Sequence, residues 1–80
     1  MKIIEVRIIS PEGVVYEGKA ERVIMPGESG VFEVLPFHKR LMSRLLSGTV
    51  LIDEHPIPIY RGVVRVESNA VTIIMEKKRK

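Results

Sequence analysis

The 80-residue chain has no cysteine, and isoleucine and valine far outnumber leucine and alanine, so we expect one small all-β domain without disulfides. The formal net charge of +3 comes from the terminal basic run 77–80, because residues 1–76 carry nine basic and ten acidic side chains, a net charge of −1. A domain with this charge balance lacks the positive surface that binding to a nucleic-acid backbone requires. Glu5 interrupts the first apolar residues, and no apolar run approaches the roughly 20 residues of a membrane span, so we expect a cytoplasmic or peripheral protein.

The N-terminal segment predicts a hairpin followed by a third strand. The two-residue period of a half-buried strand is carried by three alternating apolar residues, Ile4, Val6 and Ile8. The stretch Ser10-Pro11-Glu12-Gly13 fits a type I turn, so residues 14–17 return as the hairpin partner, which Gly18 ends. Residues 19–25 predict a half-buried third strand, closed by Pro26-Gly27.

Residues 26–38 hold two tight turns and a short strand, which indicates a rigid, displayed loop system. Gly30 permits a positive φ, and Pro36 ends the strand that runs from Val31 to Leu35. The next apolar residues are compatible with either one helical turn or a strand, and this alternative stays open for Leu41, Met42, Leu45 and Leu46.

The C-terminal half predicts two more strand pairs. Strands at 49–52 and 57–60 flank a turn-rich connector at 53–56, and Pro58 places the second of them at a sheet edge. A final hairpin turns at Ser68-Asn69-Ala70 between two alternating sets, which are Val64 with Val66, and Val71 with Ile73 and Met75. Many short strands with regular turn signals predict a small flattened β-sandwich or barrel over residues 1–76, with 77–80 as a solvated basic tail.

No catalytic, cofactor-binding or metal-ligating set is predicted. His38 and His55 are the only histidines, and neither lies in a triad-like or ligand-spaced pattern. The chain has no phosphate-binding glycine loop followed by Lys-Ser/Thr and no paired-carboxylate motif. We therefore expect neither an enzyme nor a cofactor.

Several motifs carry a likeness to a known family: Ser10-Pro11, Val15-Tyr16-Glu17-Gly18, the stretch from Pro26 to His38, and Gly48-Thr49-Val50. Together they resemble the N-terminal β-sandwich domain of the epsilon subunit of rotary F-type ATP synthases. The chain departs from the family at three places, which are Glu33 for a glycine, Lys39-Arg40 for Ala-Pro, and Arg61-Gly62 for Gly-Gly. The sequence stops at Lys80, where most relatives continue into a helical hairpin. Because autoinhibition and regulatory ATP binding reside in that hairpin, the resemblance implies that both are absent here.

The resemblance implies a non-catalytic rotor subunit that couples the gamma subunit to the membrane ring of c subunits, at the cytoplasmic face of the plasma membrane. It implies a ring-facing group made of Glu28, Ser29, Gly30 and Val31. It implies a gamma-facing group made of His38, Leu41 and Met42. Exposed Val31, Phe37 or Met42 would supply desolvated anchors, whereas alternation equally predicts that Phe32 and Leu35 fill the core.

Two other classes of function remain open on the sequence alone. One is a free-standing small β-barrel adaptor or nucleic-acid-binding module, for which a continuous basic and aromatic surface would be the distinguishing feature. The other is a small accessory domain of an enzyme. A basic cluster of Lys39, Arg40 and Arg44 is interpreted as a solvated face.

Overall fold

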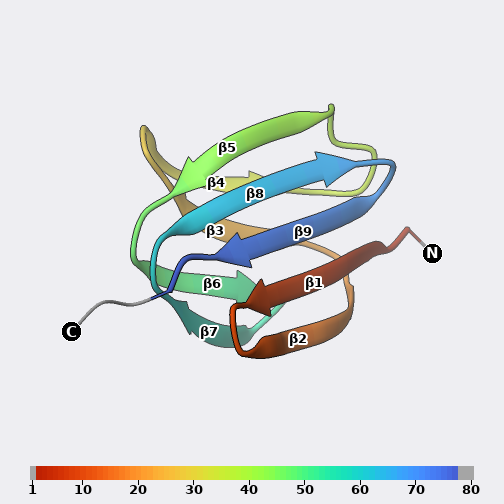
Figure 1. The fold of residues 1–80 in the computed structure, drawn as a ribbon. Helices are drawn as coiled ribbons and strands as arrows, with labels where there is room; N and C mark the ends of the chain where they lie inside the picture. Colours follow the sequence, from red (N-terminus) through yellow and green to blue (C-terminus); the bar gives the residue numbers. More distant parts are fainter. Residues whose placement is uncertain (1, 78–80) are drawn as a thin grey trace.

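A computed structural model describes residues 2–77, and every regular element in them is a β-strand (Figure 1). The strands are β1 (Ile4–Ser10), β2 (Gly13–Ala20), β3 (Val23–Gly27), β4 (Gly30–Val34), β5 (Leu41–Leu45), β6 (Gly48–Ile52), β7 (His55–Ile59), β8 (Gly62–Glu67) and β9 (Ala70–Met75). The all-β prediction is therefore confirmed. No helix in residues 2–77 is long and apolar enough to cross a membrane.

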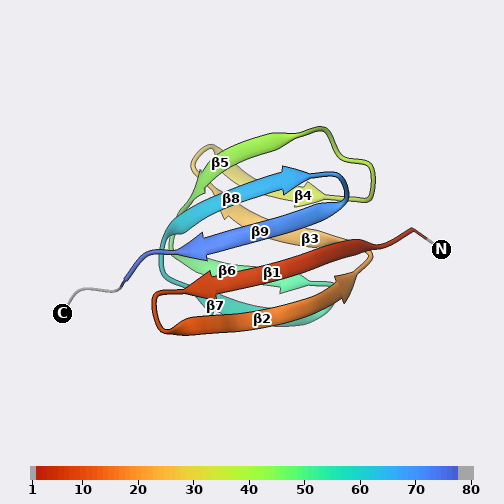
Figure 2. The ribbon, with the colours of Figure 1, turned by 45° about the vertical axis from the view of Figure 1, so that its right-hand side comes forward.

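The strands form one curled sheet whose two halves pack face to face. The strand order is β2-β1-β9-β8-β5-β3-β6-β7, and β4 pairs with β3 beside this path. Figures 1 and 2 show β2, β1, β9, β8 and β5 as one layer, with β4, β3, β6 and β7 behind it. The predicted flattened sandwich is therefore confirmed. Pro58 lies in β7, which ends the strand order, so its predicted position at a sheet edge is also confirmed.

The core between the two layers is entirely apolar. Alternation directs Ile4, Val6 and Ile8 inward from β1, and the same period buries Val71 and Ile73 on β9. Among residues 2–77 no polar or charged residue is buried. Removing each such valine or isoleucine side chain from water stabilises the fold by roughly 1.5–3 kcal/mol, so this packing is the main stabilising contribution.

Two predicted boundaries in the N-terminal half are wrong. Strand β2 does not end at Gly18, which pairs with Val6, but continues to Ala20, which pairs with Ile4. Because the full length of β1 is available as a partner, the ladder extends and the third strand begins only at Val23. Pro26-Gly27 does not close that strand either, since both residues pair with β4. The turn lies at the next two residues and ends at Gly30, whose φ of +127° confirms the predicted positive φ.

Long-range pairing resolves the open alternative at residues 41–46 in favour of a strand. All five residues of β5 pair with β8, from Leu41 opposite Val66 to Leu45 opposite Gly62. The connector predicted at 53–56 is shorter than expected, because His55 and Pro56 already pair with β6. The last hairpin turns at Ser68-Asn69 alone, and both residues have positive φ, as two-residue turns of the favoured type require.

Asp53 joins two hairpin ends that are distant in sequence. Its Oδ1 accepts hydrogen bonds from the backbone N–H groups of Glu21 (3.0 Å) and Arg22 (3.2 Å), and its own N–H donates to the Arg22 carbonyl (3.0 Å). We expect Asp53→Ala to lower the free energy of unfolding by about 1–2 kcal/mol, because two donors lose their acceptor. Asp53→Asn keeps an acceptor oxygen and tolerates the φ of +54°, so it should cost less. If Asp53→Ala has the same urea midpoint as the unaltered chain, these bonds contribute nothing to stability.

Candidate functional site: interaction surfaces

The two predicted contact groups lie at opposite ends of the sandwich. The β3–β4 turn contains Glu28 and Ser29, and β4 then leads toward the opposite end and the loop that contains His38 (Figure 1). This loop and the β8–β9 turn lie at the same end as the N-terminus. A partner at one end of the sandwich would therefore leave the other end free.

The predicted ring-facing group forms an exposed, rigid tip. All four of its residues are exposed, and the Val31 side chain retains 73% of its accessible surface. The tip is attached to the sheet by full β3–β4 pairing and by a hydrogen bond from the Leu46 N–H to the Pro26 carbonyl (2.8 Å). Within the described part of the chain Glu28 forms no ion pair. The tip therefore presents a free carboxylate beside an exposed apolar side chain.

The predicted gamma-facing group is divided between two faces of β5 and the preceding loop. His38 is exposed, and its Nδ1 lies 2.7 Å from the Lys39 carbonyl. Leu41 packs against the core, whereas Met42 points outward with 71% of its surface exposed. Only His38 and Met42 therefore present side chains to a partner, because neighbouring residues of a strand point to opposite faces.

An apolar row on the outer face of the first layer was missed by the sequence analysis. Cross-strand pairing places these side chains side by side across β2, β1, β9, β8 and β5, in the order Val14, Ile9, Ile74, Val63 and Arg44. Ile74 is 56% exposed. Arg44, at the end of the row, is the one arginine within residues 2–77 that forms no ion pair. Each of the four apolar residues is unremarkable in the sequence, and only strand register reveals the row.

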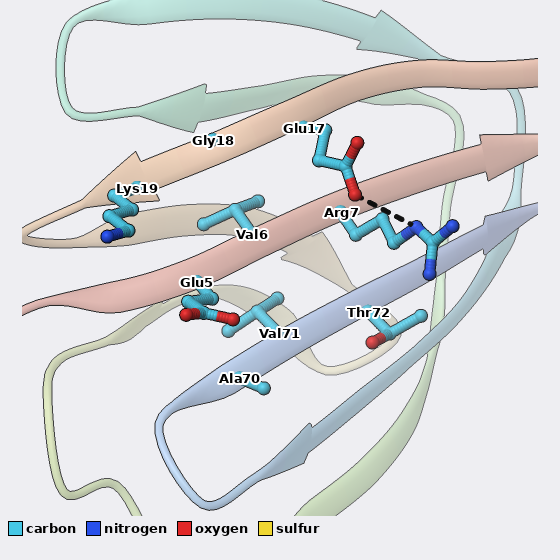
Figure 3. A pocket seen from close by; sticks show the side chains of 9 residues that line it. All are labelled: Glu5, Val6, Arg7, Glu17, Gly18, Lys19, Ala70, Val71 and Thr72. Carbon is cyan, nitrogen blue, oxygen red and sulfur yellow. Dashed lines mark ion pairs between the residues drawn. The ribbon is translucent and has the colours of Figure 1, made fainter.

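A shallow depression with both charged and apolar lining residues lies beside this row on β1, β2 and β9. Figure 3 shows Glu17 reaching Arg7, and an ion pair of 3.4 Å joins Arg7 Nε to a Glu17 carboxylate oxygen. The small side chain of Ala70 leaves the surface hollow there. The described residues contain no group of three or more His, Cys, Asp or Glu side chains placed to hold a metal ion. The described residues of the depression therefore form no metal-binding group.

Within residues 2–77 the charged and aromatic residues do not combine into a nucleic-acid surface. Most arginines face a carboxylate, as Arg22 does with Glu33 (3.7 Å) and Arg61 with Glu76 (3.2 Å). Tyr16 and Phe32 pack against the core, so they are not available to stack on bases. This arrangement argues against the nucleic-acid alternative.

Two further expectations were only partly right. Phe32 packs against the core as alternation predicted, whereas Leu35 is half exposed because it lies beyond the end of β4. The basic cluster at 39–44 is exposed as expected, although Arg40 pairs with Glu67 (3.6 Å). Of the predicted basic tail, residues 78–80 lie outside the described residues, and Lys77 is exposed.

Comparison with known proteins decides the family. The sequence family described as "ATP synthase, Delta/Epsilon chain, beta-sandwich domain" matches residues 3–78. The chain belongs to this family. The resemblance inferred from the sequence motifs is therefore confirmed.

Curated relatives named ATP synthase epsilon chain align with nearly all of this chain. The Bordetella avium (strain 197N) protein is 35% identical over 81 residues, which cover 95% of this chain and 57% of the relative. A protein from a Nitratiruptor species is 36% identical, with coverages of 95% and 63%. The Rickettsia typhi (strain ATCC VR-144 / Wilmington) protein is 35% identical over 80 residues, with coverages of 91% and 73%. The chain thus spans 57–73% of the length of these relatives.

A solved structure has the same fold. It is a chain in the cryo-EM structure of the central stalk and c-ring of the Tetrahymena thermophila mitochondrial ATP synthase, with a TM-score of 0.75 and 15% sequence identity. The match covers 92% of this chain and 63% of the other. At this identity the likeness concerns the fold.

Proposed function

We propose that this chain is a non-catalytic rotor subunit of an F-type ATP synthase, coupling the gamma subunit to the membrane ring of c subunits during ion-driven ATP synthesis. The observation that carries the proposal is the match of residues 3–78 to the delta/epsilon β-sandwich family, together with relatives named epsilon chain. The domain transmits force through packing and needs no cofactor. It works at the cytoplasmic face of the membrane, as a peripheral part of the complex.

Two surfaces support the proposed contacts. The ring-facing contact is the tip formed by residues 28–31, whose free carboxylate suits a basic or hydrogen-bonding loop of the ring. The gamma-facing contact includes His38 and Met42, because both are exposed, while Leu41 supports β5 from inside the core. A chain bound by the ring at residues 28–31 and by the gamma subunit at His38 and Met42 would rotate as a rigid body with both partners.

Purification from cells of the source tests the proposed function directly. A tagged copy of this chain is expected to co-purify with the gamma subunit and the membrane ring in detergent. Recovery of the tagged chain without either partner, under conditions that retain the remaining ATP synthase subunits together, would contradict the proposal.

Glu28→Lys is expected to separate assembly from folding. The residue is exposed at the tip and forms no ion pair in the described part of the chain, so reversing its charge should change stability by less than about 0.5 kcal/mol. If residue 28 faces the ring, the introduced lysine would instead repel a basic partner group. We expect the assembled enzyme to lose ion-driven ATP synthesis more than ATP hydrolysis.

Glu54→Lys is the matched control, because Glu54 is exposed in the β6–β7 turn at the other end of the sandwich and forms no ion pair in the described part of the chain. It should leave synthesis unchanged if it lies outside the contact. Normal coupling of the Glu28→Lys enzyme at low ionic strength would remove the tip from the ring contact, without bearing on membership of the complex.

A further inference from the structure

Phe37 combines an uncommon backbone conformation with an exposed aromatic ring. Its φ is +67°, a left-handed conformation that bulky side chains rarely adopt, and 70% of its surface is exposed. An exposed aromatic ring stabilises the isolated fold little, and the strained backbone opposes folding. The fold therefore retains a costly arrangement whose benefit does not lie inside the domain.

Asn69, in the turn between β8 and β9, stabilises the backbone conformation of Phe37. Its Oδ1 accepts a hydrogen bond of 2.6 Å from the Phe37 backbone N–H. Asn69 is itself anchored, because it sits in the β8–β9 turn and its carbonyl accepts the Glu5 N–H at 2.9 Å. The loop that carries Phe37 is thus positioned by the body of the sandwich, and the backbone that presents the ring is held in place.

The surroundings of the ring indicate the chemistry of a partner. Leu35 and Ile3 add exposed apolar surface at the same end, and the Lys2 ammonium lies 5.6 Å from the centroid of the Phe37 ring. Neither Lys2 nor Lys39 forms an ion pair in the part of the chain that the structure describes. An aromatic side chain beside unpaired cations is complementary to an apolar pocket with carboxylates at its rim.

We propose that Phe37 is an anchor that a protein partner takes into an apolar pocket rimmed by carboxylates, and that Asn69 is the residue that positions it. Binding energy at protein interfaces is concentrated in a few buried aromatic or arginine side chains. An anchor already held in its bound orientation loses less conformational freedom on association. The unfavourable backbone conformation of Phe37 is then formed during folding, so its free-energy cost does not reduce the affinity for the partner.

The test uses the gamma subunit as the probe, and in this respect the inference rests on the proposed function. Phe37→Gly removes the ring and relieves the positive φ, so its melting temperature should be unchanged or raised. Its affinity for the gamma subunit, measured by calorimetry, should fall at least tenfold. Phe37→Tyr keeps the ring and should restore most of the affinity.

Asn69→Gly tests the positioning role, because glycine tolerates the φ of +59° but removes the acceptor oxygen. It should weaken binding severalfold when Phe37 is present and have little further effect in the Phe37→Gly background. Ser68→Gly is the matched control in the same turn, also at positive φ, and should bind normally.

The outcomes separate the two proposals. If the unaltered chain binds the gamma subunit and Phe37→Gly binds within twofold of it, the anchor is refuted and the proposed function stands. A clear drop in the melting temperature of Phe37→Gly would assign the ring to folding and refute the anchor as well. If the unaltered chain does not bind the gamma subunit, the proposed gamma contact fails, and the anchor fails with it.

Discussion

Gly62→Ala is expected to lower the free energy of unfolding by about 3 kcal/mol or more. Gly62 begins β8 and is fully paired, and a Cβ there would collide with the Ile74 carbonyl group and the Met75 Cα of β9. These are backbone atoms of the neighbouring strand, so relief requires the paired ends of β8 and β9 to move apart. A domain of this size has a total stability of roughly 4–12 kcal/mol, so a loss of about 3 kcal/mol would remove between about a quarter and three quarters of it.

Gly48→Ala is the control for this prediction. A Cβ at Gly48 would approach only the Pro26 side chain, at 3.3 Å, and Gly48 lies at the exposed start of β6. It should cost well under half as much as Gly62→Ala. Urea denaturation followed by circular dichroism compares the two, and equal midpoints would mean that β9 moves aside without cost.

Ile73→Ala is expected to destabilise the domain by about 2–5 kcal/mol, because it leaves a cavity in the centre of the core. Ile73 is fully buried on β9 and pairs with Ile8 on one side and Val64 on the other. The small core offers few side chains that can move to fill the space. The loss should appear in the urea midpoint with an unchanged m-value.

Its neighbour Ile74 provides a matched control on the same strand. Ile74 points to the outer face, where more than half of its surface is in contact with water. Ile74→Ala should therefore cost less than about 1 kcal/mol, mainly through reduced strand propensity. A comparable loss for both variants would indicate that the outer row is packed as tightly as the core.

The sequence pattern was sufficient to predict a strand wherever apolar and polar residues alternate regularly. The period of β1 and of the β8–β9 hairpin predicts both the strands and their buried faces, because side-chain direction in a strand depends only on position parity. The positive φ at Gly30 could also be predicted, since glycine beside a turn is the residue that tolerates it. The family likeness adds the sandwich and the candidate contacts at residues 28–31.

The break between β2 and β3 and the strand character of β5 required the tertiary structure. Residues 19 and 20 read equally well as the end of one strand or the start of the next, and pairing of Ala20 with Ile4 decides between them. The short apolar run at 41–46 fits a helix or a strand until β8 supplies its hydrogen-bonding partner. Such choices depend on residues far away in the sequence.

The sequence by itself determined the all-β class, the alternating core positions and the family, because these depend on residue type and spacing. Only the tertiary structure separated Leu41 in the core from exposed Met42, and brought Asn69 to the backbone of Phe37 across 32 positions. Period and composition report which faces are apolar, but they do not report which strands become neighbours. Contacts between segments depend on register and on the curl of the whole sheet, and for that reason the surface features appeared only once the fold was known.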